Sequence, residues 1–269
     1  MKIAVFYENI AAGARAEGKS IGDVLAKLKD AGMDMLYLST DSWEQDGKAL
    51  RPILRDLAIG IEGMHTRIDF PQAPDTALYQ ARIDLAADSG AGNLLIVPGM
   101  LSTGHTVRDL DAIVQGMRRA VAYGEKKGLP ILMEDYDGLL APYNCMAGLQ
   151  YFLNEVPGLG CAFDTGNFVM FHEDELAAFD LFAPRIRTLH LKDRTDQPRH
   201  PGDDALSCAD GQRVYCCAVG SGSIRMAEIL RRLKERQYPG NVIVELYCCD
   251  PAFVLRDIDA SVRWLRAFC

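Results

Sequence analysis

Four short apolar segments in the second half of the chain each end at a residue type that binds metal ions. With their segments, these residues are Glu134 (130–134), Asp164 (160–164), His190 (186–192) and Glu245 (241–246). If the segments are neighbouring parallel strands, the four side chains meet at one edge of the sheet. Three carboxylates gathered there repel one another, and a divalent cation relieves that repulsion. Three oxygen ligands and one imidazole suit Mn²⁺, Co²⁺, Mg²⁺ or Zn²⁺, so the sequence predicts one divalent metal ion.

The alternative is that each of the four residues is an isolated polar group at a strand end, bonded to nearby backbone. That interpretation is favoured for any one of them taken alone. Four such residues on four successive segments favour the metal site, because polar residues at the carboxyl ends of barrel strands are typical of catalytic centres.

Two further residues are candidates for contact with a substrate. His65 ends the segment 59–65, and it either contacts a substrate or metal or is bonded to backbone. Lys192 lies two residues beyond His190, on the same face of the expected strand. Its ammonium group either polarises a carbonyl or holds an anionic group, or it is a solvated residue at the rim.

Short β-rich runs alternate with longer amphipathic stretches along the whole chain. The expected strands are 2–7, 33–38, 59–65, 93–98, 130–134, 160–164, 186–192 and 241–246. The expected helices are 20–31, 45–57, 74–89, 107–127, 145–155, 173–182, 223–236 and 252–268. Strict alternation predicts a parallel sheet. Eight strand–helix units in 269 residues favour an α/β fold of the (β/α)₈ TIM barrel type, as a single domain over residues 1–269, rather than a doubly wound open sheet.

Glycine positions and the first connection support this organisation. Gly32, Gly90, Gly128 and Gly240 each stand just before an expected strand, where the preceding helix would end. The first strand is followed by ENIAAG rather than by a glycine-rich fingerprint, which argues against a dinucleotide-binding fold.

The connection 193–222 is unusually long and is expected to be irregular, because it contains several glycines and prolines. It follows a strand end, so we expect it to cover the catalytic face, with His200 reaching the substrate if the segment closes. The sequence Gly-Ser-Gly-Ser at 220–223 is a candidate phosphate cradle. The favoured interpretation is instead that Ser223 caps the following helix.

Composition indicates a globular protein with a negative charge. The chain has 29 Lys and Arg against 37 Asp and Glu, a formal charge of −8, which disfavours nucleic acid as a partner. The N-terminal MKIAVFYEN is typical of a strand rather than of a secretion signal, and no apolar run reaches membrane-spanning length. We therefore expect a cytoplasmic protein whose eight cysteines are reduced. The sequence leaves open whether the protein forms a homo-oligomer.

The strand-end motifs resemble those of the xylose isomerase-like TIM barrel superfamily, which includes the sugar phosphate isomerases/epimerases. The resemblance spans the chain in strand order and rests on Glu134, Asp-Thr-Gly-Asn at 164–167, Leu-His-Leu-Lys-Asp at 189–193 and Val-Ile-Val-Glu at 242–245. It implies that Glu134, Asp164, His190 and Glu245 bind one metal ion. It also implies that Glu134 and Glu245 act as base and acid on opposite faces of a substrate carbon, through a metal-bound enediolate. The expected activity is isomerisation or epimerisation of a small carbohydrate, namely a sugar, sugar phosphate or keto-sugar.

Two positions depart from the pattern of ketose 3-epimerases. Those enzymes usually carry a His three residues after the metal-binding Asp, where this chain has Asn167. They also carry an Arg six residues after the metal-binding His, where this chain has Asp196, with Arg194 nearby. We therefore expect Asn167 and Arg194, together with His65 and Lys192, to contact the substrate.

Four other functions remain as alternatives. A lyase on the same barrel, such as an inosose dehydratase or a carbon-glycoside-cleaving enzyme, shares the enediolate chemistry and differs in what leaves. An endonuclease IV-like DNA-repair nuclease is disfavoured, because Asn167 replaces a histidine that would bind a second zinc ion. A non-catalytic metal-stabilised binding protein is disfavoured by the intact ligand set. An amidohydrolase is disfavoured because no His-x-His ends an early strand.

Overall fold

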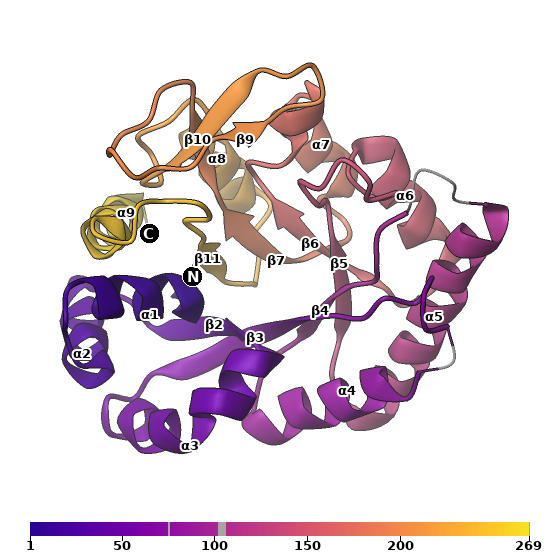
Figure 1. Ribbon diagram of the computed structural model, residues 1–269, viewed down its shortest axis with the longest axis horizontal. Coiled ribbons are helices and arrows are strands. Elements are labelled where there is room, and N and C mark those ends of the chain that lie inside the picture. Colours follow the sequence, from indigo (N-terminus) through magenta and orange to yellow (C-terminus); the bar gives the residue numbers. More distant parts are fainter. Residues whose placement is uncertain (75, 102–105, 269) are drawn as a thin grey trace.

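The computed structural model describes residues 1–74, 76–101 and 106–268. Eight parallel strands form its centre: β1 (Ile3–Phe6), β2 (Met35–Ser39), β3 (Gly60–Arg67), β4 (Leu94–Val97), β5 (Ile131–Glu134), β6 (Gly160–Asp164), β7 (Ile186–Leu191) and β11 (Val242–Val244). They close into a barrel in the order β1-β11-β7-β6-β5-β4-β3-β2 (Figure 1). Each of the eight strands overlaps a segment that the sequence predicts, which confirms the TIM barrel.

β1 and β4 are apolar along their whole length, and β5 is apolar up to its last residue, because both faces of these strands are covered. Every residue of β1, β4 and β5 is buried, including Glu134 at the end of β5. In a parallel barrel one face packs on the interior and the other on the surrounding helices, so short continuous apolar runs are expected. Glu62 inside β3 and Thr188 inside β7 are buried polar exceptions, and the Thr188 hydroxyl donates to Glu62 Oε1 at 3.1 Å.

Helices surround the barrel (Figure 1). They are α1 (Tyr7–Ala16), α2 (Ile21–Ala31), α3 (Thr40–Asp56), α4 (Leu78–Ser89), α5 (Val107–Lys127), α6 (Met146–Glu155), α7 (Glu175–Phe182), α8 (Met226–Glu235) and α9 (Val254–Phe268), with a short 3₁₀ helix at Phe168–Phe171. No helix in the described residues is both long and apolar enough to cross a membrane.

The prediction that a glycine ends the preceding helix is confirmed at three positions and wrong at the fourth. Gly32, Gly90 and Gly128 are left-handed caps with φ of 115°, 84° and 68°. Gly240 is not a cap, because α8 ends five residues earlier. There the left-handed residue after the helix is Gln237, with φ 52°.

The first strand is shorter than expected, and α1 is an element that the prediction omits. The strand ends at Phe6, and α1 follows without a loop. Tyr7, Ile10, Ala11 and Ala14 are buried on one face of this helix. Their spacing of three, four and seven residues is the helical pattern that carries this information in the sequence.

The connection 193–222 is irregular only in part, because it contains three short strands. It contains β8 (Asp193–Thr195), β9 (Leu206–Ser207) and β10 (Arg213–Cys217), which form an antiparallel sheet in the order β8-β10-β9. In Figure 1 the orange ribbon of β9 and β10 stands outside the ring of barrel strands. The prediction missed this sheet because β8 (Asp-Arg-Thr) and β9 (Leu-Ser) lack the continuous apolar run that marks the barrel strands.

Asp193 organises the end of this connection. Its carboxylate accepts hydrogen bonds from the backbone N–H groups of Gly220, Gly222, Ile224 and Arg194, at 2.9 to 3.2 Å. A Cβ on Gly222 would lie 2.3 Å from Asp193 Oδ1, so this close approach needs glycine. Two backbone donors of the candidate phosphate cradle at 220–223, those of Gly220 and Gly222, are therefore taken by a carboxylate of the chain itself.

Ser223 is not the cap of α8, which corrects the favoured interpretation. The helix begins at Met226, and Arg225 holds the cap position. The Ser223 hydroxyl donates instead to the Arg194 carbonyl at 3.0 Å. Ser223 therefore ties the end of the connection back to β8.

Candidate metal centre

A cavity of ≈ 210 Å³ opens among the carboxyl ends of the barrel strands. It is lined by Phe6, Glu8, Asn9, His65, Arg67, Leu95, Val97, Glu134, Tyr136, Asp137, His190, Lys192, Glu245 and Tyr247. A larger groove of ≈ 780 Å³ lies along α8 beside Met1 and Phe268, and none of the predicted site residues lines it. The chemistry expected from the sequence therefore lies in the smaller cavity.

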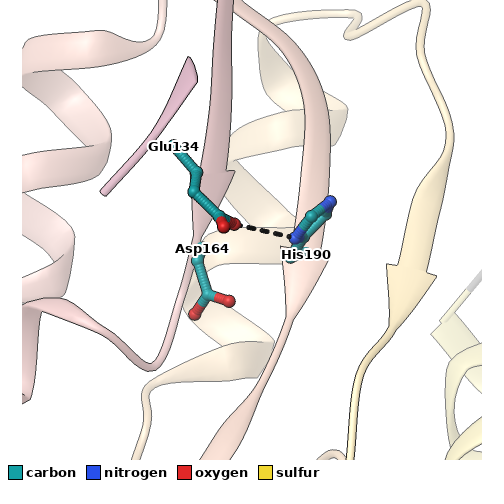
Figure 2. Close-up of side chains that lie close together, drawn as sticks. All are labelled: Glu134, Asp164 and His190. Atoms are coloured by element: carbon teal, nitrogen blue, oxygen red, sulfur yellow. Dashed lines mark ion pairs between the residues drawn. The ribbon is translucent and has the colours of Figure 1, made fainter. Parts of the chain in front are cut away.

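Neighbouring strand ends bring three of the predicted ligands together. Glu134 and Asp164 are the last residues of β5 and β6, and Asp164 is the register partner of His190 on β7. Among the described residues, Glu134, Asp164 and His190 each offer a ligand atom, and these atoms all lie within 4.8 Å of one another. Figure 2 shows the three side chains converging from adjacent strands, with Glu134 Oε2 3.3 Å from His190 Nδ1.

Glu245, the fourth predicted ligand, stands beside this group rather than within it. It follows β11 directly, and its Oε2 lies 3.2 Å from His190 Nδ1. Its Oε1 lies 2.8 Å from Lys192 Nζ. Glu134 and Glu245 thus approach the same ring nitrogen of His190.

Lys192 is a buried cation in contact with the predicted ligands. Besides its ion pair with Glu245, Nζ lies 2.9 Å from Asp164 Oδ2 and donates to Asn167 Oδ1 at 3.1 Å. The whole residue is only 3% exposed, so it is not a solvated residue at the rim. Its position favours a role in compensating the charge of the carboxylates of the cluster.

Burial and these neighbours shift the proton affinities of the cluster. Burial raises the pKa of Asp164 to about 7, although Lys192 opposes that shift. Burial alone would lower the pKa of His190, but Glu134 and Glu245 outweigh it and raise the pKa to about 10. Burial also opposes ionisation of Glu245, yet Lys192 and His190 hold its pKa well below the usual range.

The donor set fits a divalent cation. Among the described residues, His190 Nε2 is buried without a hydrogen-bond partner. Asp164 Oδ2 and His190 Nδ1 are held only by ion-pair contacts, with Lys192 at 2.9 Å and with Glu134 and Glu245 at 3.3 and 3.2 Å. A buried polar atom without a partner is costly, and a metal ion can bind to its lone pair. Carboxylate oxygens with one imidazole suit Mg²⁺, Mn²⁺, Co²⁺ or Zn²⁺. Glu134, Asp164 and His190 would hold such an ion, with Glu245 at its edge.

Asp135, which the sequence interpretation did not name, accepts hydrogen bonds from Asp164 and Asn167. It is fully buried; its Oδ1 accepts from Asp164 N at 3.0 Å, and its carbonyl accepts from Asn167 Nδ2 at 2.6 Å. Burial raises its pKa well above the usual range. The Glu-Asp doublet at 134–135 is the signal that marks it.

Asn167 and Arg194 are buried next to the site but do not line the cavity. Arg194 Nε donates to the Gly166 carbonyl at 3.1 Å, and its Nη2 lies 3.4 Å from Asp137 Oδ2. Their role as substrate contacts stays a prediction. His65 and Lys192 do line the cavity.

Among the described residues, none between 193 and 222 lines the cavity. His200 Nε2 is bound to Asp257 Oδ2 at 2.7 Å, and its ring stacks on Phe253 with centroids 4.4 Å apart. His200 is therefore held against α9 and its preceding loop, not over the strand ends.

Comparison with known proteins identifies relatives of this barrel. The family model described as xylose isomerase-like TIM barrel matches residues 25–268. An inosose dehydratase of Lacticaseibacillus casei is 36% identical over 137 residues, which are 50% of this chain and 46% of that protein. The chain thus matches this curated relative over about half of the relative's length.

Solved structures share the same architecture. A probable 3-DHS dehydratase of Bacillus anthracis superposes with a TM-score of 0.75 at 15% identity, over 99% of each chain. A D-allulose 3-epimerase from Methylomonas sp. superposes with a TM-score of 0.72 at 16% identity, over 100% of this chain and 98% of that one. At these identities the likeness establishes the fold alone.

Proposed function

This chain belongs to the xylose isomerase-like TIM barrel family, and we propose that it is a divalent-metal-dependent enzyme that moves protons on a small carbohydrate. The observation that carries the proposal is the convergence of Glu134, Asp164 and His190, whose ligand atoms lie within 4.8 Å of one another; Glu134 and His190 line the strand-end cavity. A cavity of ≈ 210 Å³ suits a small polyhydroxylated carbonyl compound better than a polymer.

The proposed reaction begins with removal of a proton beside a carbonyl group. When bound, a divalent cation would draw electron density from that carbonyl and so acidify the adjacent C–H bond. Glu134 and Glu245 flank Nδ1 of His190 at 3.3 and 3.2 Å and both line the cavity. One carboxylate takes the proton, and the other returns it to the substrate. The net reaction is then an isomerisation or epimerisation.

Lys192 serves the same step by its charge. It holds Glu245 in the carboxylate form, with Nζ 2.8 Å from Glu245 Oε1. Asp164 is held by the backbone of Gly166, whose N–H donates to Oδ1 at 2.8 Å, so Oδ2 faces the cluster. The two residues act by charge and orientation rather than by covalent chemistry.

A second candidate is loss of water after the same proton removal. The inosose dehydratase of Lacticaseibacillus casei, 36% identical over half of this chain, favours it. Both candidates start from the same carbanion-forming step and differ in whether a hydroxyl group on the next carbon departs.

One experiment separates these outcomes. The protein, loaded with Mn²⁺, is incubated in D₂O with a panel of ketoses, keto-inositols and 3-keto-glycosides. Deuterium in recovered substrate or in an epimer supports proton transfer, and a new absorbance from a conjugated enone supports loss of water. Binding of Mn²⁺ without exchange or product on any member of the panel would contradict the proposed function.

A further inference from the structure

A second pair of polar side chains lines the cavity, away from the metal cluster. Glu8 stands in the first turn of α1, and His65 stands near the end of β3. Glu8 Oε2 and His65 Nε2 lie 3.8 Å apart. Both atoms are buried, and neither has a hydrogen-bond partner among the described residues. Two unpaired polar atoms that face each other mark a pair whose function the metal cluster does not explain.

Glu8 is a fixed anion. Its Oε1 accepts a hydrogen bond from Ser39 N at 2.8 Å and another from the Ser42 hydroxyl at 2.6 Å. Burial alone would raise the pKa of Glu8, but His65 and these two donors outweigh it and lower the pKa to about 2. The N-terminus of α1 adds a favourable partial positive charge. Oε2 is thus held in place toward the His65 ring.

The ring of His65 is also oriented by aromatic contacts. It stacks on Tyr37 with centroids 5.7 Å apart and an angle of 12°, and its centroid lies 5.5 Å from that of Phe6. The same two rings contact His190, at 5.0 and 5.2 Å. The two imidazoles therefore flank one apolar pair. Nε2 of His65 is buried 3.8 Å from Glu8 Oε2, and His65 lines the cavity.

We propose that His65 is a general acid for a departing hydroxyl group and that Glu8 is the residue that positions it. This inference rests on the proposed function and extends it toward loss of water. Epimerisation needs only a base and an acid at one carbon, which Glu134 and Glu245 supply. A hydroxyl group on the neighbouring carbon leaves poorly unless it is protonated, and the His65 imidazole, which lines the same cavity as Glu134 and Glu245, is placed to supply that proton.

The step balances without an oxidant or reductant. A carboxylate of the cluster accepts the proton from the carbon beside the carbonyl, and the C–H electron pair becomes the new C=C bond. The C–O bond on the next carbon breaks, and its electron pair leaves with oxygen. The proton of His65 joins that oxygen, which departs as water. The carboxylic acid then loses its proton to solvent, and the imidazole regains one.

The test uses the Mn²⁺-loaded protein, a keto-inositol and its analogue with fluorine in place of the departing hydroxyl. In His65→Gln we expect enone formation from the hydroxyl compound to fall by roughly a hundredfold, while C–H exchange in D₂O stays within about threefold of wild type. Elimination from the fluoro compound should be nearly preserved, because fluoride leaves without full protonation. Glu8→Gln should show the same pattern with a smaller loss.

His172→Gln is the matched control. Its Nε2 also pairs with a carboxylate, Asp210 Oδ2, at 3.1 Å, but on the surface and away from the cavity. This variant should leave exchange and elimination unchanged. Equal loss of both reactions in His65→Gln, loss of neither, or exchange without any water loss in the wild type would overturn the inference while leaving the proposed function standing.

A second measurement needs no substrate. ¹⁵N spectra of the imidazoles, recorded on the metal-free protein and assigned through His65→Gln, report which ring nitrogen carries the proton. Glu8→Gln should change the His65 signals and leave those of His172 unmoved. Unchanged His65 signals would overturn the pairing, whatever the outcome with the substrate panel.

Discussion

Lys192 Nζ lies 2.8 Å from Glu245 Oε1, and this buried ion pair joins the end of β7 to the end of β11. The same ammonium lies 2.9 Å from Asp164 Oδ2. One lysine thus compensates two carboxylates that the sequence assigns to a metal ion. The arrangement means that the ammonium and a metal ion act on the same two negative charges.

Replacing Lys192 by Met should therefore have opposite effects on the metal-free and the loaded protein. Without metal, the buried carboxylates lose their partner, and the free energy of unfolding should fall by about 3 kcal/mol. With the positive charge gone, the affinity for Mn²⁺ should rise severalfold. Urea denaturation in EDTA and calorimetric titration measure the two effects.

The control for that experiment is Lys127→Met, which removes an exposed ion pair with Asp84 at 2.7 Å. It should change neither quantity, because exposed pairs contribute little. Weaker Mn²⁺ binding in Lys192→Met would instead mean that the lysine holds the ligands in place.

Metal binding itself should depend on the strand-end carboxylates. We expect about one divalent ion per chain in the wild type and at least a hundredfold weaker binding in the double variant Asp164→Ala/Glu245→Ala. The exposed pair Asp210→Ala/Glu235→Ala has the same change in charge and should bind normally. Elemental analysis and titration check this, and undiminished binding in the first variant would rule out the site.

Glutamine variants separate metal binding from proton transfer at Glu134 and Glu245. Glutamine keeps an oxygen ligand but cannot accept a proton. Both variants should therefore retain metal, more weakly, and lose turnover by roughly a hundredfold or more. If the reaction is an epimerisation, one variant should still exchange the C–H proton of one epimer, and the other that of the opposite epimer. Near-normal turnover in both variants would shift the acid–base role to Lys192 and His65.

The positions of the barrel strands could be predicted because their signal is local. Leu94–Val97 is four apolar residues in a row, all buried, between turn residues. The meeting of Glu134, Asp164 and His190 follows from the same information, since parallel strands that are neighbours place their ends together.

Other parts of the site depend on contacts that no local pattern encodes. Glu8 belongs to a helix that the interpretation missed, and it meets His65 only because β1 and β3 both pair with β2. The ion pairs of Lys192 depend on the direction of its side chain across the barrel mouth. Nothing in the sequence around Asp193 indicates that its carboxylate accepts hydrogen bonds from four backbone N–H groups.

Asp193 leads to the last prediction, which concerns stability. Its carboxylate accepts N–H groups from Gly220, Gly222, Ile224 and Arg194, so Asp193→Ala leaves these donors without their acceptor. An unsatisfied buried donor costs about 1–3 kcal/mol, and partial solvation limits the total to roughly 3–4 kcal/mol. Asp193→Asn keeps one oxygen acceptor and should lose about half as much.

The matched control for Asp193→Ala is Asp196→Ala, three residues along the same connection and exposed to solvent. It should unfold at the same urea concentration as the wild type. The order of stability is then wild type and Asp196→Ala, followed by Asp193→Asn and finally Asp193→Ala. Because Asp193 closes the end of the connection onto β8, its loss should also broaden the amide signals of 220–224 in heteronuclear spectra. Equal stability of Asp193→Ala and Asp196→Ala would mean that water replaces the carboxylate without cost and that this loop is free to bind an external anion.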